Sequence, residues 1–282
     1  MEIIKAILFG IIEGITEWLP VSSTGHMILL DELIRLRVGD EAFAAEFYSM
    51  FEVVIQLGAI LAVVVLFFRK LNPFALSKTP EEKKATWMLW LRVLVAILPS
   101  GVIGILLDDF LDAHLGNYVV VALALIVYGV AFILVERRQN ATVKVDSVDA
   151  ISWRMALAVG AFQVLSLIPG TSRSGSTILG AMLLGLSRTA ASEFSFFMAI
   201  PTMAGAGLIR GYKFFDYVAE SGVSVPTEAW VVLAVGCATA FVVSLAAIRF
   251  LMDFVKRQTF TAFGIYRIAL GVLVLGYFAF VG

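Results

Sequence analysis

Six stretches of this sequence are apolar over lengths close to the roughly 20 residues that a helix needs to cross a bilayer. Hydrophobic residues make up 60% of the chain and charged residues 15%, whereas soluble domains average about 25% charged residues. We therefore predict an all-α polytopic membrane protein, with about six transmembrane helices in a single membrane domain over residues 1–282. The predicted spans are Phe51–Phe68, Leu89–Leu107, Tyr118–Val135, Phe194–Ile209, Trp230–Ile248 and Ile268–Val281.

Two further apolar stretches, residues 3–36 and 153–187, are interrupted by residues that break helices. Pro20 and Pro169 are each followed by a run rich in Ser, Thr and Gly, so each arm is too short to span a bilayer. Non-helical backbone is tolerated at membrane depth only where protein or a water-filled cavity surrounds it. We therefore predict two re-entrant helical hairpins, and expect them to form a functional site.

The two interrupted stretches occupy matching places in the chain, and each is followed by three predicted spans. Aligning Pro20 with Pro169 places Ser23 opposite Ser172. Since three spans reverse the side on which a second copy begins, we predict two repeats of inverted topology, an architecture known from transporters. The predicted repeats are residues 1–140 and residues 150–282.

The distribution of positive charge predicts the orientation in the membrane. Residues 69–92, 137–154 and 249–257 are rich in Lys and Arg, whereas residues 108–117 contain neither and residues 211–228 are acidic on balance. Because cytoplasmic loops carry the excess of Lys and Arg, this alternation places both termini outside. The formal net charge of −1 argues against nucleic acid as a partner.

Two carboxylates, Glu13 and Glu17, lie four residues apart and therefore on one face of the first hairpin helix. A carboxylate at the centre of a membrane helix costs about 2.5–3.5 kcal/mol on insertion scales. A divalent cation, Mg²⁺ or Ca²⁺, would compensate both charges, and we predict Glu13 and Glu17 as its ligands. The alternatives are one protonated carboxyl group, or a helix whose acids face water at the membrane edge.

The turn that follows combines hydroxyl groups with a histidine. Ser23 offers a nucleophile and His26 a general base or acid, so we predict both as catalytic residues. A histidine by itself is more often structural, but His26 follows two acids and a cluster of hydroxyls in a segment that must be shielded from lipid.

The turn of the second hairpin has the composition of an anion site. Free N–H groups at a helix start attract anions, and the guanidinium of Arg173 suits phosphate. We predict that Arg173 binds phosphate together with the hydroxyls of Ser172, Ser174 and Thr177. The alternative is a capped turn with an interfacial arginine. Arg267 is either a second phosphate ligand or a membrane-interface anchor, and composition alone favours the anchor.

These motifs resemble the undecaprenyl-diphosphatase family, also called bacitracin-resistance proteins, over essentially the whole chain. Glu13 and Glu17, followed by the run Pro20–His26, match the first signature of that family. Pro169–Thr177 matches the second signature at every fixed position, and Phe51–Gly58 is also similar to the family segment.

The resemblance implies a bacterial inner-membrane enzyme that converts undecaprenyl diphosphate to the monophosphate carrier used in peptidoglycan synthesis, with bacitracin resistance as a result. It also implies a divalent cation and a site facing the periplasm or exterior; a homodimer is left open. In our hypothesis His26 activates Ser23 or a water molecule. The residues to which the resemblance gives roles are Glu13, Glu17, Ser23, His26, Ser172, Arg173, Thr177 and Arg267. We therefore predict Glu17, Ser23, His26 and Arg173 as catalytic residues, and Arg267 as a further phosphate ligand.

Two other functions fit the same pattern. Inverted repeats with broken helices are also expected in a secondary transporter or lipid flippase, and a non-catalytic lipid-binding subunit would not need Glu17 or His26. Acid-phosphatase-like lipid phosphatases are rejected, because they need a second histidine in the core and His114 falls in an acidic outer connection.

Overall fold

The computed structural model describes residues 1–115, 117–139 and 143–281. Within these residues the regular secondary structure is helical, apart from one isolated bridge between Val145 and Leu186. The aspartates of the predicted outer connection fall among side chains 108–113, which lie outside the described part. The longer elements are α1 (Glu2–Thr16), α2 (Ser23–Ile34), α3 (Glu41–Leu66), α5 (Pro80–Leu115), α6 (Tyr118–Gln139), α7 (Trp153–Val164), α8 (Arg173–Leu183), α9 (Arg188–Ser221), α10 (Thr227–Arg257) and α11 (Thr261–Val281); α4 (Phe68–Leu71) and the 3-10 turns Val148–Ala150 and Leu165–Leu167 are short.

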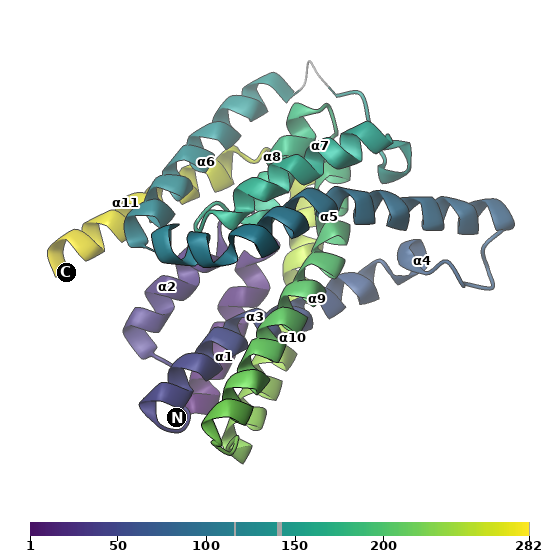
Figure 1. The fold of residues 1–282 in the computed structure, drawn as a ribbon. Helices are drawn as coiled ribbons and strands as arrows, with labels where there is room; N and C mark the ends of the chain where they lie inside the picture. Colours follow the sequence, from purple (N-terminus) through teal and green to yellow (C-terminus); the bar gives the residue numbers. More distant parts are fainter. Residues whose placement is uncertain (116, 140–142, 282) are drawn as a thin grey trace.

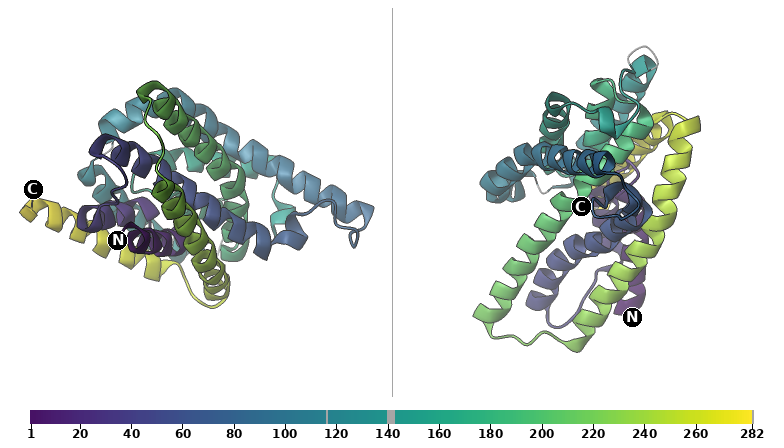
Figure 2. Two further views of the ribbon diagram at one scale, coloured as in Figure 1. Left: turned by 90° about the horizontal axis from the view of Figure 1, so that it is seen from below. Right: turned by 90° about the vertical axis from the view of Figure 1, so that its right-hand side faces the viewer.

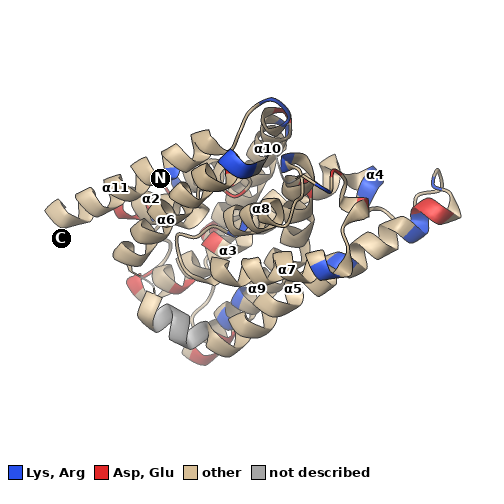
Figure 3. Cartoon of the chain, turned by 90° about the horizontal axis from the view of Figure 1, so that it is seen from above, with Lys and Arg blue, Asp and Glu red and all other residues tan. Residues whose placement is uncertain are grey.

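Six of the described helices, α3, α5, α6, α9, α10 and α11, are long and apolar enough to cross a membrane. Five of these helices contain a predicted span, and α3 overlaps the sixth, whose predicted end at Phe68 lies two residues beyond Leu66. The prediction of an all-α polytopic membrane protein is therefore confirmed. Figure 3 shows that long stretches of these helices carry no charged residue, as membrane-spanning segments require. Lys and Arg lie near α4 and the adjoining end of α5, among other places.

The predicted span boundaries were too short because hydropathy detects only the apolar middle of a helix. α3 begins at Glu41, well before the predicted Phe51, because the Asp40 side chain accepts the Phe43 N–H at 2.9 Å and caps the helix. α9 runs past the predicted end to Ser221, and ends where Gly222 adopts a φ of 67°.

Both interrupted stretches form a helix, a turn and a second helix, as predicted. Among the described residues, Ser22 (φ 74°) and Ser172 (φ 70°) are the only non-glycine residues with positive φ. Each serine caps the following helix by accepting the N–H of a glycine three residues later, at 3.3 Å from Gly25 and 3.2 Å from Gly175. Ser22 is therefore the counterpart of Ser172, and the predicted alignment of Ser23 with Ser172 was wrong by one residue.

The first arm of each hairpin lies along a long helix from the other half of the chain (Figures 1 and 2). α1 packs on α10 and α7 packs on α5. A Cβ atom at Gly10 would lie 2.7 Å from the Gly236 carbonyl oxygen, and one at Gly160 would lie 1.9 Å from the Ala96 carbonyl oxygen. Only glycine allows such close helix packing, a device common in membranes.

Two further contacts between the halves join an element to its own counterpart. α3 packs on α9, and α6 packs on α11, so elements in matching places of the two halves meet each other. Gly10 and Gly160 are separated by the same number of residues as Ser22 and Ser172, so both pairs occupy equivalent positions in the two halves. This exchange of contacts is what two related halves would give, whereas their opposite orientation in a bilayer stays a prediction.

Candidate active site

The two hairpin turns meet through a buried ion pair between Glu17 and Arg173. Arg173 Nη2 lies 3.0 Å and Nε 3.3 Å from Glu17 Oε1, and the two side chains are only 9% and 6% exposed, Arg173 first. The Ser23 hydroxyl donates to the other carboxylate oxygen, Oε2, at 2.9 Å. The structure therefore brings together three of the predicted catalytic residues, contributed by both halves of the chain.

Several contacts hold the Arg173 side chain in its orientation toward Glu17. Its Nη1 donates to the Ser195 carbonyl oxygen at 2.8 Å. The Thr177 hydroxyl donates to the Arg173 carbonyl oxygen at 2.8 Å and lies 2.6 Å from the Ser195 hydroxyl. The Trp18 ring lies beneath the guanidinium at 6.0 Å. Sequence reasoning missed Ser195, because one small polar residue inside an apolar span carries no signal.

The other predicted phosphate-binding hydroxyls are engaged in shaping the turns. The Ser174 hydroxyl donates to the Glu17 carbonyl oxygen at 2.8 Å, which ties the second hairpin to the backbone of the first. The Ser172 hydroxyl caps α8 and lies 3.2 Å from the Ser174 hydroxyl. In this conformation Ser172, Ser174 and Thr177 support Arg173 and Glu17, and their binding of phosphate stays a prediction.

His26 is held by contacts on both ring nitrogens. Nδ1 lies 2.7 Å from the Ser22 carbonyl oxygen, and Nε2 lies 2.7 Å from the Tyr266 hydroxyl, with the two rings stacked 5.7 Å apart. Since a carbonyl only accepts, Nδ1 carries a proton, and in the neutral form of the ring Nε2 would accept the Tyr266 hydroxyl. Tyr266 was not predicted, although it directly precedes Arg267.

Arg267 lies between the two turns and is completely buried. Its Nη1 donates to the Pro20 carbonyl oxygen at 3.2 Å, and its Nη2 donates to the carbonyl oxygens of Gly170 and Thr171, both at 2.9 Å. The guanidinium also stacks over Tyr128, at 5.5 Å from the ring centroid. The interpretation of Arg267 as a membrane-interface anchor was wrong, because it joins the hairpins inside the protein.

Glu13 lies one turn before Glu17 on α1 and is 1% exposed. Its Oε1 has no hydrogen-bond partner among the described residues. No three His, Cys, Asp or Glu side chains in this part of the chain form a group that could hold a metal alone. Mg²⁺, however, is usually held by one or two carboxylates with water and substrate phosphate, and Glu13 and Glu17 fit that smaller role.

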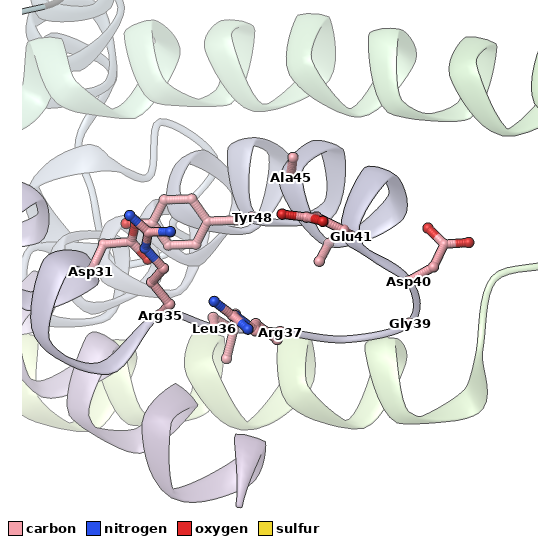
Figure 4. A pocket seen from close by; sticks show the side chains of 10 residues that line it. Asp31, Arg35, Leu36, Arg37, Gly39, Asp40, Glu41, Ala45 and Tyr48 are labelled. Carbon is pink, nitrogen blue, oxygen red and sulfur yellow. The ribbon is translucent and has the colours of Figure 1, made fainter.

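A cavity of about 500 Å³ opens beside the first hairpin, between the end of α2 and the start of α3 (Figure 4). Arg35, Arg37 and Asp31 line it from the α2 side, and Tyr48 lines it from α3. None of the residues that line the cavity is a predicted site residue.

Comparison with known proteins gives one consistent result. Residues 6–273 match the family described as bacitracin resistance protein BacA. An undecaprenyl-diphosphatase of Limosilactobacillus fermentum is 53% identical over 280 residues, which cover 99% of this chain and 98% of that protein. An undecaprenyl-diphosphatase of Enterococcus faecalis is 54% identical over 277 residues, covering 98% and 97%. The chain therefore belongs to the bacitracin resistance protein BacA family.

Proposed function

We propose that the protein hydrolyses undecaprenyl diphosphate to undecaprenyl phosphate and inorganic phosphate at the bacterial cytoplasmic membrane. This activity would recycle the lipid carrier for peptidoglycan synthesis and give resistance to bacitracin. The names of the relatives support the substrate. The observation that carries the proposal is the buried contact of Arg173 with Glu17, whose other oxygen accepts the Ser23 hydroxyl.

Arg173 would bind the terminal phosphate. Its Nε and Nη2 now share one oxygen of Glu17, and this edge of the guanidinium matches two oxygens of a phosphate. Nη1 remains on the Ser195 carbonyl, so the side chain keeps its direction when the phosphate displaces Glu17 Oε1. Phosphoryl transfer depends mainly on such positioning and charge neutralisation, which act strongly in a dry site.

Glu17 would accept the proton of the attacking group. The Ser23 hydroxyl already donates to Glu17 Oε2, so the geometry favours Glu17 over His26 as the proton acceptor for Ser23. The attacking oxygen of Ser23, or of a water in its place, forms a bond to the terminal phosphorus as the bond to the bridging oxygen breaks. Undecaprenyl phosphate then leaves, and for attack by Ser23 water releases the phosphate in a second step.

Glu13 and Glu17 would hold a divalent cation, Mg²⁺ or Ca²⁺, which when bound supplies positive charge beside the phosphate oxygens. The unpartnered, buried Oε1 of Glu13 supports this assignment. The extracytoplasmic orientation of the site also belongs to the proposal, and rests on the distribution of Lys and Arg between the connections.

The decisive experiment measures phosphate release from undecaprenyl diphosphate by the purified protein in detergent, with and without EDTA. We expect release that EDTA abolishes, and a loss of at least about 10²-fold in Arg173→Ala. Arg257→Ala, at an exposed position at the end of α10, is the matched control and should keep full activity. Absence of release, together with lipid movement in vesicles, would favour the transporter or flippase instead.

A further inference from the structure

Arg267 joins the turns of both hairpins from a helix that belongs to neither. Its acceptors are the carbonyl oxygens of Pro20 in the first turn and of Gly170 and Thr171 in the second. These carbonyls lie one or two residues before the two capping serines, in the turn of each hairpin. One side chain of α11 therefore contacts both segments that carry the candidate catalytic residues.

Main-chain carbonyls occupy most of the N–H groups of Arg267, and the side chain is closed off from solvent. A guanidinium has five N–H donors, and three of them are used by the carbonyls. Nε has no partner among the described residues, and a Cβ atom at Gly175 would lie 3.0 Å from Nη1. Since the whole residue is 0% exposed, a phosphate could reach it only if the groups packed around it moved aside.

We propose that Arg267 is a positioning residue that sets the distance between the Glu17–Ser23 turn and the Arg173 turn, and does not bind the substrate phosphate. The kinetic part of this inference rests on the proposed function. The ion pair between Glu17 and Arg173 spans the same junction, but the substrate phosphate displaces it in the proposed reaction. The contacts of Arg267 to main-chain carbonyls persist, and would hold the turns together at that moment.

Arginine suits this task better than lysine. Its planar fork serves carbonyls from two segments at once, whereas a lysine ammonium presents three donors from a single nitrogen. The flat guanidinium also stacks on the Tyr128 ring at 5.5 Å from the centroid, which a lysine would do less well. Arg267→Lys thus keeps the charge but loses the bridge.

The test compares Arg267→Lys with Arg188→Lys in the full-length protein. Arg188 binds Glu136 through both its Nε and Nη2 and joins α9 to α6 away from the hairpin turns, so its variant controls for lost stability. We expect Arg267→Lys to lower kcat about 10²-fold, the effect of a displacement near 1 Å. KM and the inhibition constant for inorganic phosphate should stay within about twofold. Arg188→Lys should lower the melting temperature and keep kcat.

A phosphate ligand would give a different result. If Arg267→Lys weakens inhibition by inorganic phosphate about tenfold or more, Arg267 binds phosphate and the proposal is wrong. It is equally wrong if kcat is unchanged.

Gly175→Ala provides a second test that keeps the Arg267 side chain, because the added methyl group would press on Nη1 and on the neighbouring Ser172 side chain. We expect it to lower kcat with little change in phosphate inhibition, and unchanged kcat would contradict the proposal. In the double variant with Arg267→Lys, the fall in melting temperature should be smaller than the two single effects combined. The melting temperatures can be measured without enzymatic activity. If the wild-type protein proves inactive, the proposed function is wrong, but the contact between Gly175 and Arg267 can still be tested.

Discussion

The ion pair between Glu17 and Arg173 can be tested by separating its effect on stability from its effect on activity. Both side chains are less than one-tenth exposed, so this pair belongs to the buried class. Removing one partner of such a pair leaves an uncompensated charge and costs about 3–5 kcal/mol, whereas replacing both partners is often close to neutral. The perturbations are Glu17→Gln, Arg173→Met and the double variant.

The contacts of each residue decide where the single variants fall in that range. Glu17→Gln leaves Arg173 with the Ser195 carbonyl and a glutamine oxygen, so we expect a cost near 3 kcal/mol. Arg173→Met leaves the Glu17 carboxylate with only the Ser23 hydroxyl as a side-chain donor, so its cost should be nearer 5 kcal/mol. The double variant contains neither charge and should be more stable than Arg173→Met alone.

The assay is reversible denaturant unfolding of the purified protein in detergent, followed by tryptophan fluorescence. Phosphate release is measured on the same samples, and should fall at least about 10²-fold in all three variants. Recovery of stability without recovery of activity would therefore identify a pair that is both structural and catalytic. If the losses in free energy of unfolding caused by the two single variants simply add in the double variant, the two side chains are not paired and the reasoning fails.

Three further predictions concern neighbouring residues. Ser23→Ala should lower kcat about 10²-fold if its hydroxyl attacks the phosphate, and should cost about 1–3 kcal/mol of stability because Glu17 Oε2 loses its donor. A fall in kcat of less than tenfold in the phosphate assay would assign the attack to water. Glu13→Gln should raise the Mg²⁺ concentration for half-maximal activity at least about tenfold, since even outer-shell changes weaken metal binding that much; an unchanged titration would exclude Glu13 as a ligand. Tyr266→Phe removes the hydroxyl at His26 Nε2, and should lower kcat about tenfold, as expected for one orienting hydrogen bond. His26→Ala should then lower kcat further than Tyr266→Phe does. If Tyr266→Phe is as active as the wild type, the hydrogen bond to His26 is not needed for activity and the prediction is wrong.

The sequence predicted the features that depend on local chemistry. Apolar length predicted the six spans, and Pro20 and Pro169 with their hydroxyl runs predicted two hairpins. The two hairpins were also expected to form one site, because polar and ionisable residues in apolar segments must be shielded and compensated. Each of these inferences rests on the free energy of placing one segment in the membrane, which does not depend on the segment's neighbours. The direct contact of Glu17 with Arg173 was not predicted, since a divalent cation was expected to compensate Glu17.

The features that the sequence did not predict depend on which segments meet. Ser195 and Tyr266 become important only because α9 and α11 pass the turns, and neither residue lies in a recognisable pattern. The pairing of Ser22 with Ser172 was missed for a related reason. Proline marks where a helix breaks, but the positive φ at the capping serine marks where the next helix begins, and sequence alone does not give φ.

The two hairpins share one construction and differ in the chemistry that it carries. Glu13 in α1 and Gln163 in α7 occupy corresponding positions, with the same sequence separation as the capping serines, and each has a buried Oε1 without a partner among the described residues. The Gln163 amide nitrogen donates to Ser100 at 2.6 Å, a neutral contact that does not require a counterion.

Charge is thus divided between the turns, with the acids Glu13 and Glu17 on the first hairpin and Arg173 on the second. A substrate phosphate bound by Arg173 would meet a cation held by the acids only where the two turns are in contact. Separation of the turns would leave buried charges of both signs without partners, at a cost of several kcal/mol for each. Contacts that keep the turns together therefore avoid this penalty, and Arg267 makes such contacts through its hydrogen bonds to main-chain carbonyls of both turns.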